Sequence, residues 1–125
     1  MPSLRDKMLH LGMSLMTALV SDAGVKTLQL TIEGCRHNPE IPQRFNEVGV
    51  KFAVEKLEAF MGEARDRGEL EAPDLHHAAN VFVSLMRGDL HFQRLLNLIP
   101  EPSPAEVQLE VERAVAVFLT AFRKG

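Results

Sequence analysis

The sequence predicts an all-α fold of five helices. Apolar residues recur every three or four positions in five segments, which is the spacing of amphipathic helices, and no segment alternates apolar and polar residues as a strand does. Proline, glycine and short polar residues separate these segments. The chain has 125 residues, of which 46% are hydrophobic and 25% charged, so its length and composition fit one globular domain.

The first helix is expected over residues 4–20, with apolar residues on two of its sides. Ser21 is placed to cap a second helix. The apolar line of that helix consists of Val25, Leu28, Ile32 and Cys35. A residue before proline is pushed out of the helical region. The second helix is therefore expected to end at Asn38, which precedes Pro39.

The third helix is expected between Pro42 and Gly68, a run of about 25 residues. Pro42 suits its first turn, where the missing N–H would be unpaired anyway, and Gly68 suits the position just beyond its end. Two apolar stripes run along it, one with Val50, Val54, Leu57, Met61 and Ala64 and one with Phe45, Val48 and Phe52. Most of the circumference of this helix should therefore be covered by other parts of the protein.

A fourth helix is expected from Asp74 to about Asn97. One side carries Leu75, Ala78, Ala79, Phe82, Leu85, Met86 and Leu96, and a separate side carries Val81, Gly88, Phe92 and Leu95. The fifth helix begins at Ser103-Pro104-Ala105-Glu106, a capping box with proline at the first helical position. Its apolar line includes Val107, Val111, Ala114, Val115, Phe118 and Phe122. Several helices are thus apolar on two sides, which is more than one subunit of this size comfortably buries, so an oligomer is expected.

Charge and composition exclude several classes of function. The net charge is −3 and lysine or arginine never occurs three times in a row, so this chain alone is not expected to bind DNA. No stretch approaches the roughly 20 apolar residues of a membrane span. The single cysteine, Cys35, excludes an intramolecular disulfide and fits a reducing cytoplasm.

The search for chemistry yields no catalytic or metal-binding pattern. His76 and His77 are adjacent and point in different directions on a helix, and Cys35 and His37 diverge as well. No phosphate-binding loop, dinucleotide motif or nucleophile elbow occurs. We therefore expect no enzyme activity, no metal site and no cofactor.

Two polar residues of the fourth helix fall on an apolar line. In a continuous helix, Asp89 and Gln93 share the arc of Phe82 and Met86. Buried polar groups need partners, so one interpretation is an internal pair, for example of Asp89 with Arg36 or Arg44. The other is a polar anchor in a small-molecule cavity lined by Phe and Met. The apolar stripes are open to the same two interpretations, core or cavity lining.

The chain resembles the C-terminal regulatory domain of TetR/AcrR-family transcriptional regulators. The resemblance covers essentially the whole chain and rests on the order and spacing of five phrases. These are Thr27-Leu28-Gln29-Leu30-Thr31-Ile32-Glu33-Gly34, Asn38-Pro39-Glu40-Ile41 with Phe45, Ala64-Arg65-Asp66-Arg67-Gly68-Glu69-Leu70, Phe82-Val83-Ser84-Leu85-Met86-Arg87-Gly88-Asp89-Leu90-His91-Phe92, and Ser103-Pro104-Ala105-Glu106.

The resemblance implies a ligand-responsive repressor in which residues 1–125 form the effector-binding and dimerisation domain. An N-terminal helix-turn-helix domain would read a palindromic operator, and no such segment precedes Leu4, so operator DNA would be bound only through that missing part. The last two helices of each subunit would form a four-helix bundle in a homodimer. The expected dimer residues are Val81, Gly88, Phe92, Leu95, Val107, Val111 and Phe118.

The expected effector is a small, mostly apolar molecule with one polar or cationic group, because Phe and Met side chains recur at helical spacing and the carboxylate of Asp89 falls on the same arc. Its expected contacts are Leu28, Ile32, Phe45, Phe52, Phe82 and Met86, with Asp89 or Gln93 as polar anchor. The alternative is a free-standing helical dimerisation or adaptor module without a ligand. The upstream reading frame distinguishes the two, because a regulator requires a helix-turn-helix segment there.

Overall fold

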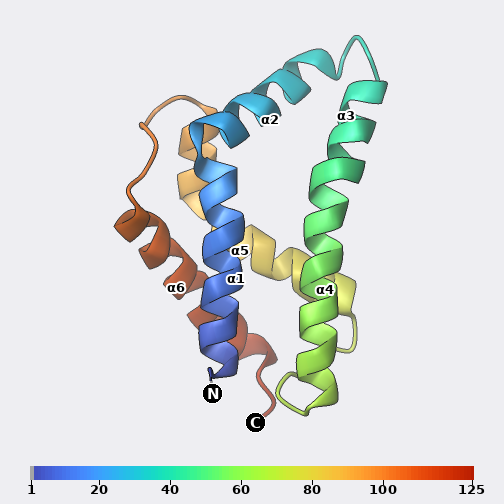
Figure 1. The fold of residues 1–125 in the computed structure, drawn as a ribbon, viewed down its shortest axis with the longest axis vertical. Coiled ribbons are helices and arrows are strands. Elements are labelled where there is room, and N and C mark those ends of the chain that lie inside the picture. Colours follow the sequence, from blue (N-terminus) through green and yellow to red (C-terminus); the bar gives the residue numbers. More distant parts are fainter. Residues whose placement is uncertain (1) are drawn as a thin grey trace.

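Helices make up most of residues 2–125, the part of the chain that the computed structural model describes (Figure 1). The elements are α1 (Leu4–Val20), α2 (Asp22–Gly34), α3 (Glu40–Phe45), η1 (Asn46–Val50), α4 (Lys51–Asp66), α5 (Leu75–Leu95) and α6 (Pro104–Phe122). α3, the π-helical turn η1 and α4 follow one another without a break, so they correspond to the third expected helix. Within residues 2–125 the β-type pairing is limited to one isolated bridge, between Leu70 and Arg123. The prediction of an all-α, five-helix fold is confirmed.

α1, α5 and α6 pack against one another, and α4 packs on α5. In Figure 1, α1 and the run α3–η1–α4 stand on two sides of the molecule, α5 crosses between them, and α2 spans the upper end. In the described part of the chain no single helix is long and apolar enough to cross a membrane. α1 and α2 reach that length and composition only together, and they are bent by 60°.

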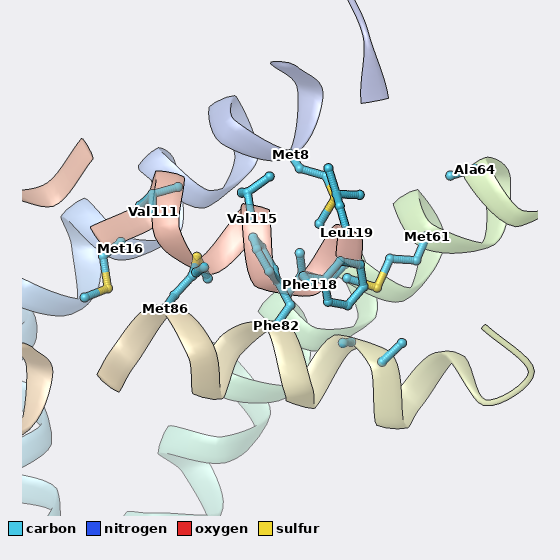
Figure 2. Close-up of a cluster of buried hydrophobic side chains, with 14 of the residues drawn as sticks. Met8, Met16, Met61, Ala64, Phe82, Met86, Val111, Val115, Phe118 and Leu119 are labelled. Carbon is cyan, nitrogen blue, oxygen red and sulfur yellow. The ribbon is translucent and has the colours of Figure 1, made fainter. Parts of the chain in front are cut away.

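The core lies where α5 and α6 meet α1 and α4 (Figure 2). The ring of Phe82 in α5 packs edge-on against Phe118 in α6, with 5.5 Å between ring centroids, and Phe118 stacks on Phe122 at 4.6 Å. Gly12 lets α1 approach α6 closely, because a Cβ there would lie 2.7 Å from Val111 Cγ1. Other fully buried side chains are Met8, Met16, Leu57, Met61, Met86 and Val115.

The helix ends follow the capping signals in the sequence. Ser21 Oγ accepts from the amide of Gly24, and Ser103 and Glu106 form the expected capping box. Gly68, with φ of +79°, follows α4 as expected. The amide of Gly68 donates to Arg65 O and that of Glu69 to Ala64 O, which is a Schellman motif.

The predicted end of the second helix at Asn38 is wrong by four residues. α2 ends at Gly34. The chain turns there because Ile41 of α3 packs against the bare α-carbon of Gly34, with its Cδ1 2.8 Å from where a Cβ would stand. The side chain of Asn38 instead accepts a hydrogen bond from the amide of Glu40 at the start of α3.

α5 is broken at Gly88. Its φ of +40° and ψ of −144° lie in a region that is essentially restricted to glycine. The helix continues on both sides, but in a different direction and phase. Residues after Gly88 therefore do not continue the faces that residues 75–87 define, which overturns any prediction based on one unbroken α5.

Candidate functional site

An apolar hollow of about 320 Å³ lies between α1, the η1 region and α5. Ligand pockets in proteins typically range from about 300 to 1,000 Å³ and are mostly apolar. The lining consists of Leu15, Ala18 and Leu19 from α1, Phe45, Gly49, Val50, Ala53 and Val54 from the α3–η1–α4 run, and Val83, Met86 and Arg87 from α5. All of these residues except Arg87 are uncharged and apolar.

A second hollow of about 380 Å³ adjoins the first. Ala18, Leu19 and Phe45 line both, so the two hollows are neighbours, and together we call them the recess. The second hollow adds Leu28 from α2 and His91 from the part of α5 after the break. We call the first the main hollow and the second the side hollow.

The π-helical turn η1 contributes space to the main hollow. It supplies Gly49 and Val50 to the lining, and nothing lies within 4 Å of the position that a Cβ of Gly49 would occupy. π-Helical turns inside α-helices occur frequently at functional sites. The sequence predicted an uninterrupted helix here, because hydrophobic periodicity does not reveal a single extra residue in one turn.

Arg87 and His91 provide the ionisable groups of the recess, and Ser21 and Thr27 add hydroxyl groups in the side hollow. Arg87 Nε donates a hydrogen bond of 3.3 Å to His91 Nδ1. The imidazole is buried, and its Nε2 has no hydrogen-bond partner among the described residues. Burial and, to a smaller extent, the neighbouring Arg87 charge lower the pKa of His91 below 6.5, so the ring is neutral at pH 7. Neither residue was singled out from the sequence, which gives no sign that His91 is buried.

The structure brings together only part of the predicted effector-binding set. Phe45 and Met86 line the main hollow, and Leu28 lines the side hollow. Ile32 and Phe52 are 54% and 63% exposed and belong to neither lining, while Phe82 is fully buried in the core. Apolar periodicity alone does not distinguish these three environments.

The predicted polar anchors lie elsewhere. Gln93 Nε2 donates to Asp89 Oδ2 at 2.7 Å, Asp89 is exposed, and neither residue lines the recess. The pairing of Asp89 with Arg36 or Arg44 is not present either. Both expectations assumed a continuous α5, and the break at Gly88 moves the two residues off the arc of Met86.

The predicted dimer residues divide into two groups. Val107, Val111 and Phe118 of α6 are at most 3% exposed and pack inside the subunit, so that part of the prediction is wrong. Val81, Gly88, Phe92 and Leu95 of α5 line shallow depressions on the outside, and Phe92 is 59% exposed. The outward apolar residues of α6 are instead Leu109 and Val117.

Among the described residues, no three His, Cys, Asp or Glu side chains cluster as a metal site would require.

Residues 6–124 match the family of AefR-like transcriptional repressors, in their C-terminal domain. The chain belongs to this family. This confirms the resemblance to a TetR-type C-terminal regulatory domain, and the family and the structural neighbours are transcriptional regulators rather than enzymes. No curated protein sequence matches the AefR-like domain significantly.

Solved structures of TetR-family regulators share the fold of this AefR-like domain. One from Mesorhizobium loti MAFF303099 has 16% identity and a TM-score of 0.91. The match covers 98% of this chain and 61% of that regulator. One from Pseudomonas syringae pv. tomato str. DC3000 has 22% identity and a TM-score of 0.78, and the match covers 100% of this chain and 63% of that regulator. The Flavonoid-responsive Regulator FrrA has 28% identity and a TM-score of 0.75, and the match covers 96% of this chain and 59% of FrrA. The chain thus spans about three fifths of the length of these proteins.

Proposed function

We propose that this chain is the effector-sensing and dimerisation domain of a TetR-family repressor. A small apolar molecule in the recess would control operator binding by a helix-turn-helix domain N-terminal to Leu4, in the cytoplasm. The observation that carries the proposal is the apolar recess between α1, η1 and α5 in a domain of a repressor family. FrrA, whose name describes a response to flavonoids, is a relative of similar fold.

The position of the recess suggests how a ligand signals. Its walls include α1, which begins where the DNA-binding domain would be attached, and α5, which carries the outward apolar residues Val81, Phe92 and Leu95. A ligand shifts the equilibrium only by binding one arrangement of these helices better than another. A tilt of α1 against α5 would misalign two DNA-binding domains with adjacent major grooves.

Filling the main hollow should abolish binding of an apolar probe. Ala53 lines the hollow from α4, and Ala53→Phe places a ring there. We expect the affinity for 2-ethylnaphthalene, measured by fluorescence titration, to fall at least about tenfold, because the ring occupies the ligand's volume. Ala59→Phe, on the exposed side of α4, is the matched control and should bind the probe as the parent chain does. Equal loss in both variants, or no binding by the parent chain, would instead favour a dimerisation module without a ligand.

We further propose that the outward sides of α5 and α6 form the homodimer interface. It would comprise Val81, Phe92 and Leu95 from α5 with Leu109 and Val117 from α6. Leu109 and Val117 are 46% and 54% exposed in the isolated subunit, and Phe92 is 59% exposed. Large apolar side chains that a subunit leaves exposed are typical of an interaction surface, and helices of two subunits commonly pair in bundles.

Introducing a charge into this interface should dissociate the dimer. Val117→Glu places a carboxylate in a dry contact, where an unpaired charge is costly. We expect the dimer dissociation constant to rise at least about tenfold, which corresponds to about 1.4 kcal/mol. Sedimentation velocity would detect the change as a shift toward the 13.9 kDa subunit. Leu30→Glu, at an equally exposed apolar residue of α2, should remain dimeric; dissociation of that variant alone would place the interface on α2 instead.

A further inference from the structure

Two neighbouring depressions lie along the outer side of α5. Their volumes are about 310 and 360 Å³, and Ser84 lines both of them. Phe92 and Leu95 line the first, and Val81 lines the second. Ser84 precedes the break at Gly88 while Phe92 follows it, so both halves of α5 contribute to one surface although the helix changes direction. We call this surface the α5 face, and it consists of Val81, Ser84, Gly88, Phe92 and Leu95.

Gly88 lies in the middle of the α5 face and leaves the backbone open there. The residue is exposed, and nothing lies within 4 Å of the position that a Cβ would occupy. Another backbone can therefore approach α5 at this point without meeting a side chain. Ser84, one turn before Gly88, is small, whereas Phe92, one turn after it, is large and 59% exposed. The α5 face thus has room on one side of Gly88 and a projecting ring on the other.

The residue spacing of the α5 face is symmetric about Gly88. Ser84 and Phe92 each lie four residues from Gly88, on opposite sides, and the two ends of the face, Val81 and Leu95, each lie seven residues away. In a two-fold dimer the same patch of both subunits must fit itself. Reversing α5 about Gly88 brings the large Phe92 of one copy to the level of the small Ser84 of the other. A surface that binds an unrelated protein requires no such symmetry, so the spacing favours a second copy of this chain.

We propose that two copies of this chain cross antiparallel at Gly88 of α5, with the Phe92 ring of each copy seated beside Ser84 of the other. The two-fold axis would pass between the two Gly88 backbones. Leu95 of each copy would then lie at the level of Val81 in the other. The proposal rests on the proposed dimerisation role and specifies which surface of the partner subunit α5 meets.

Two side chains belong both to this surface and to the recess. Arg87 lines the main hollow and also the depression beside Gly88. His91 lines the side hollow and the same depression, and it accepts the hydrogen bond from Arg87 Nε. A molecule in the recess that displaced either side chain would change the depression that receives Phe92 of the partner subunit. Ligand binding and dimerisation would thus be coupled through this pair.

A size swap between positions 84 and 92 tests this crossing. Phe92→Ser removes the ring and Ser84→Phe fills its place, so either change alone should raise the dimer dissociation constant at least about tenfold. The double variant Ser84→Phe/Phe92→Ser exchanges ring and hollow, and it should dimerise within about threefold of the parent chain, because residues in contact do not act additively. Both positions are exposed in the subunit, so the variants should keep the helical circular dichroism spectrum of the parent. Sedimentation equilibrium provides the dissociation constants.

Phe52→Ser is the matched control for Phe92→Ser. Phe52 is 63% exposed and lies on α4, away from the α5 face, so the dissociation constant of this variant should equal that of the parent. Additive losses in the double variant, or no loss in Phe92→Ser, would overturn the crossing at Gly88 while leaving a dimerisation role in place. A parent chain that stays monomeric would instead contradict the proposed dimerisation itself.

Cross-linking of two different variants tests the register independently. Ser84→Cys and Phe92→Cys chains, both with Cys35→Ser to remove the native thiol, are mixed above their dissociation constants and treated with bismaleimidoethane, which joins two nearby thiols. We expect cross-linked dimers from the mixture and few from either variant alone, because the crossing places position 84 of one copy beside position 92 of the other. Equally efficient cross-linking of Ser84→Cys alone would mean that the two helices meet in another register and would overturn the proposal.

Discussion

Replacing Phe118 by alanine is expected to lower the free energy of unfolding by about 4 kcal/mol, the usual cost of truncating a buried phenylalanine. The Phe118 side chain is completely buried in α6. It contacts Phe82 of α5 edge-on (Figure 2). It also stacks on Phe122, so its removal leaves a cavity between α5 and α6. Aromatic contacts of this kind add to the loss of buried area.

Urea unfolding followed by circular dichroism measures this change. The parent chain and the variant must be compared at one protein concentration, because the stability of a protein that associates with itself depends on concentration. Phe52→Ala is the control, since Phe52 is 63% exposed and a surface substitution usually changes stability by no more than about 0.5 kcal/mol. Similar midpoints for the two variants would mean that Phe118 does not lie in the core.

The helix boundaries could be predicted because they depend on local chemistry. Ser21 and Ser103 cap the helices that follow them, and Gly68 adopts the left-handed conformation that ends α4. Each of these interactions joins residues within a few positions of one another, so the sequence contains both partners. The end of α2 was predicted wrongly because it depends on a contact between Gly34 and Ile41 of the next helix.

The recess could be predicted only in part, because one backbone conformation decides which residues line it. Glycine inside a helical pattern is usually tolerated, so Gly88 gave no reason to divide α5. Its φ of +40° changes the helix phase and separates Asp89 from Met86. Likewise, Phe45, Phe52 and Phe82 share the same chemistry but lie in a hollow, on the surface and in the core. Long-range packing, rather than periodicity, distinguishes them.

The same reasoning applies to the proposed dimer face. α6 has apolar residues on two sides, and the sequence does not indicate which side the subunit uses for itself. Packing assigns Val107, Val111 and Phe118 to the core, which leaves Leu109 and Val117 outside. The sequence therefore indicates that α6 is apolar on two sides more readily than which of its residues stay outside.

Replacing Arg94 by alanine should have the second largest effect on stability, a loss of about 3 kcal/mol, because it removes several hydrogen bonds from a charged donor at once. Arg94 is buried near the end of α5. Its guanidinium donates to Val20 O at 2.8 Å, to Ile99 O at 3.2 Å and to Asp22 Oδ1 at 2.7 Å. One side chain thus holds the corner between α1 and α2 to the end of α5.

The conservative and partner variants identify which of these contacts matters. Arg94→Lys should recover only part of the loss, because an ammonium cannot reproduce the planar fork that reaches three acceptors. Asp22→Asn should cost less than about 1 kcal/mol, since the Asp22 side chain is 84% exposed and exposed ion pairs contribute little. Urea unfolding of the three variants provides the comparison. If Asp22→Asn were as destabilising as Arg94→Ala, the ion pair rather than the two backbone carbonyls would hold the α1–α2 corner in place. That corner forms one end of the side hollow through Ser21 and Gly24, so its rigidity bears directly on the shape of the proposed effector site.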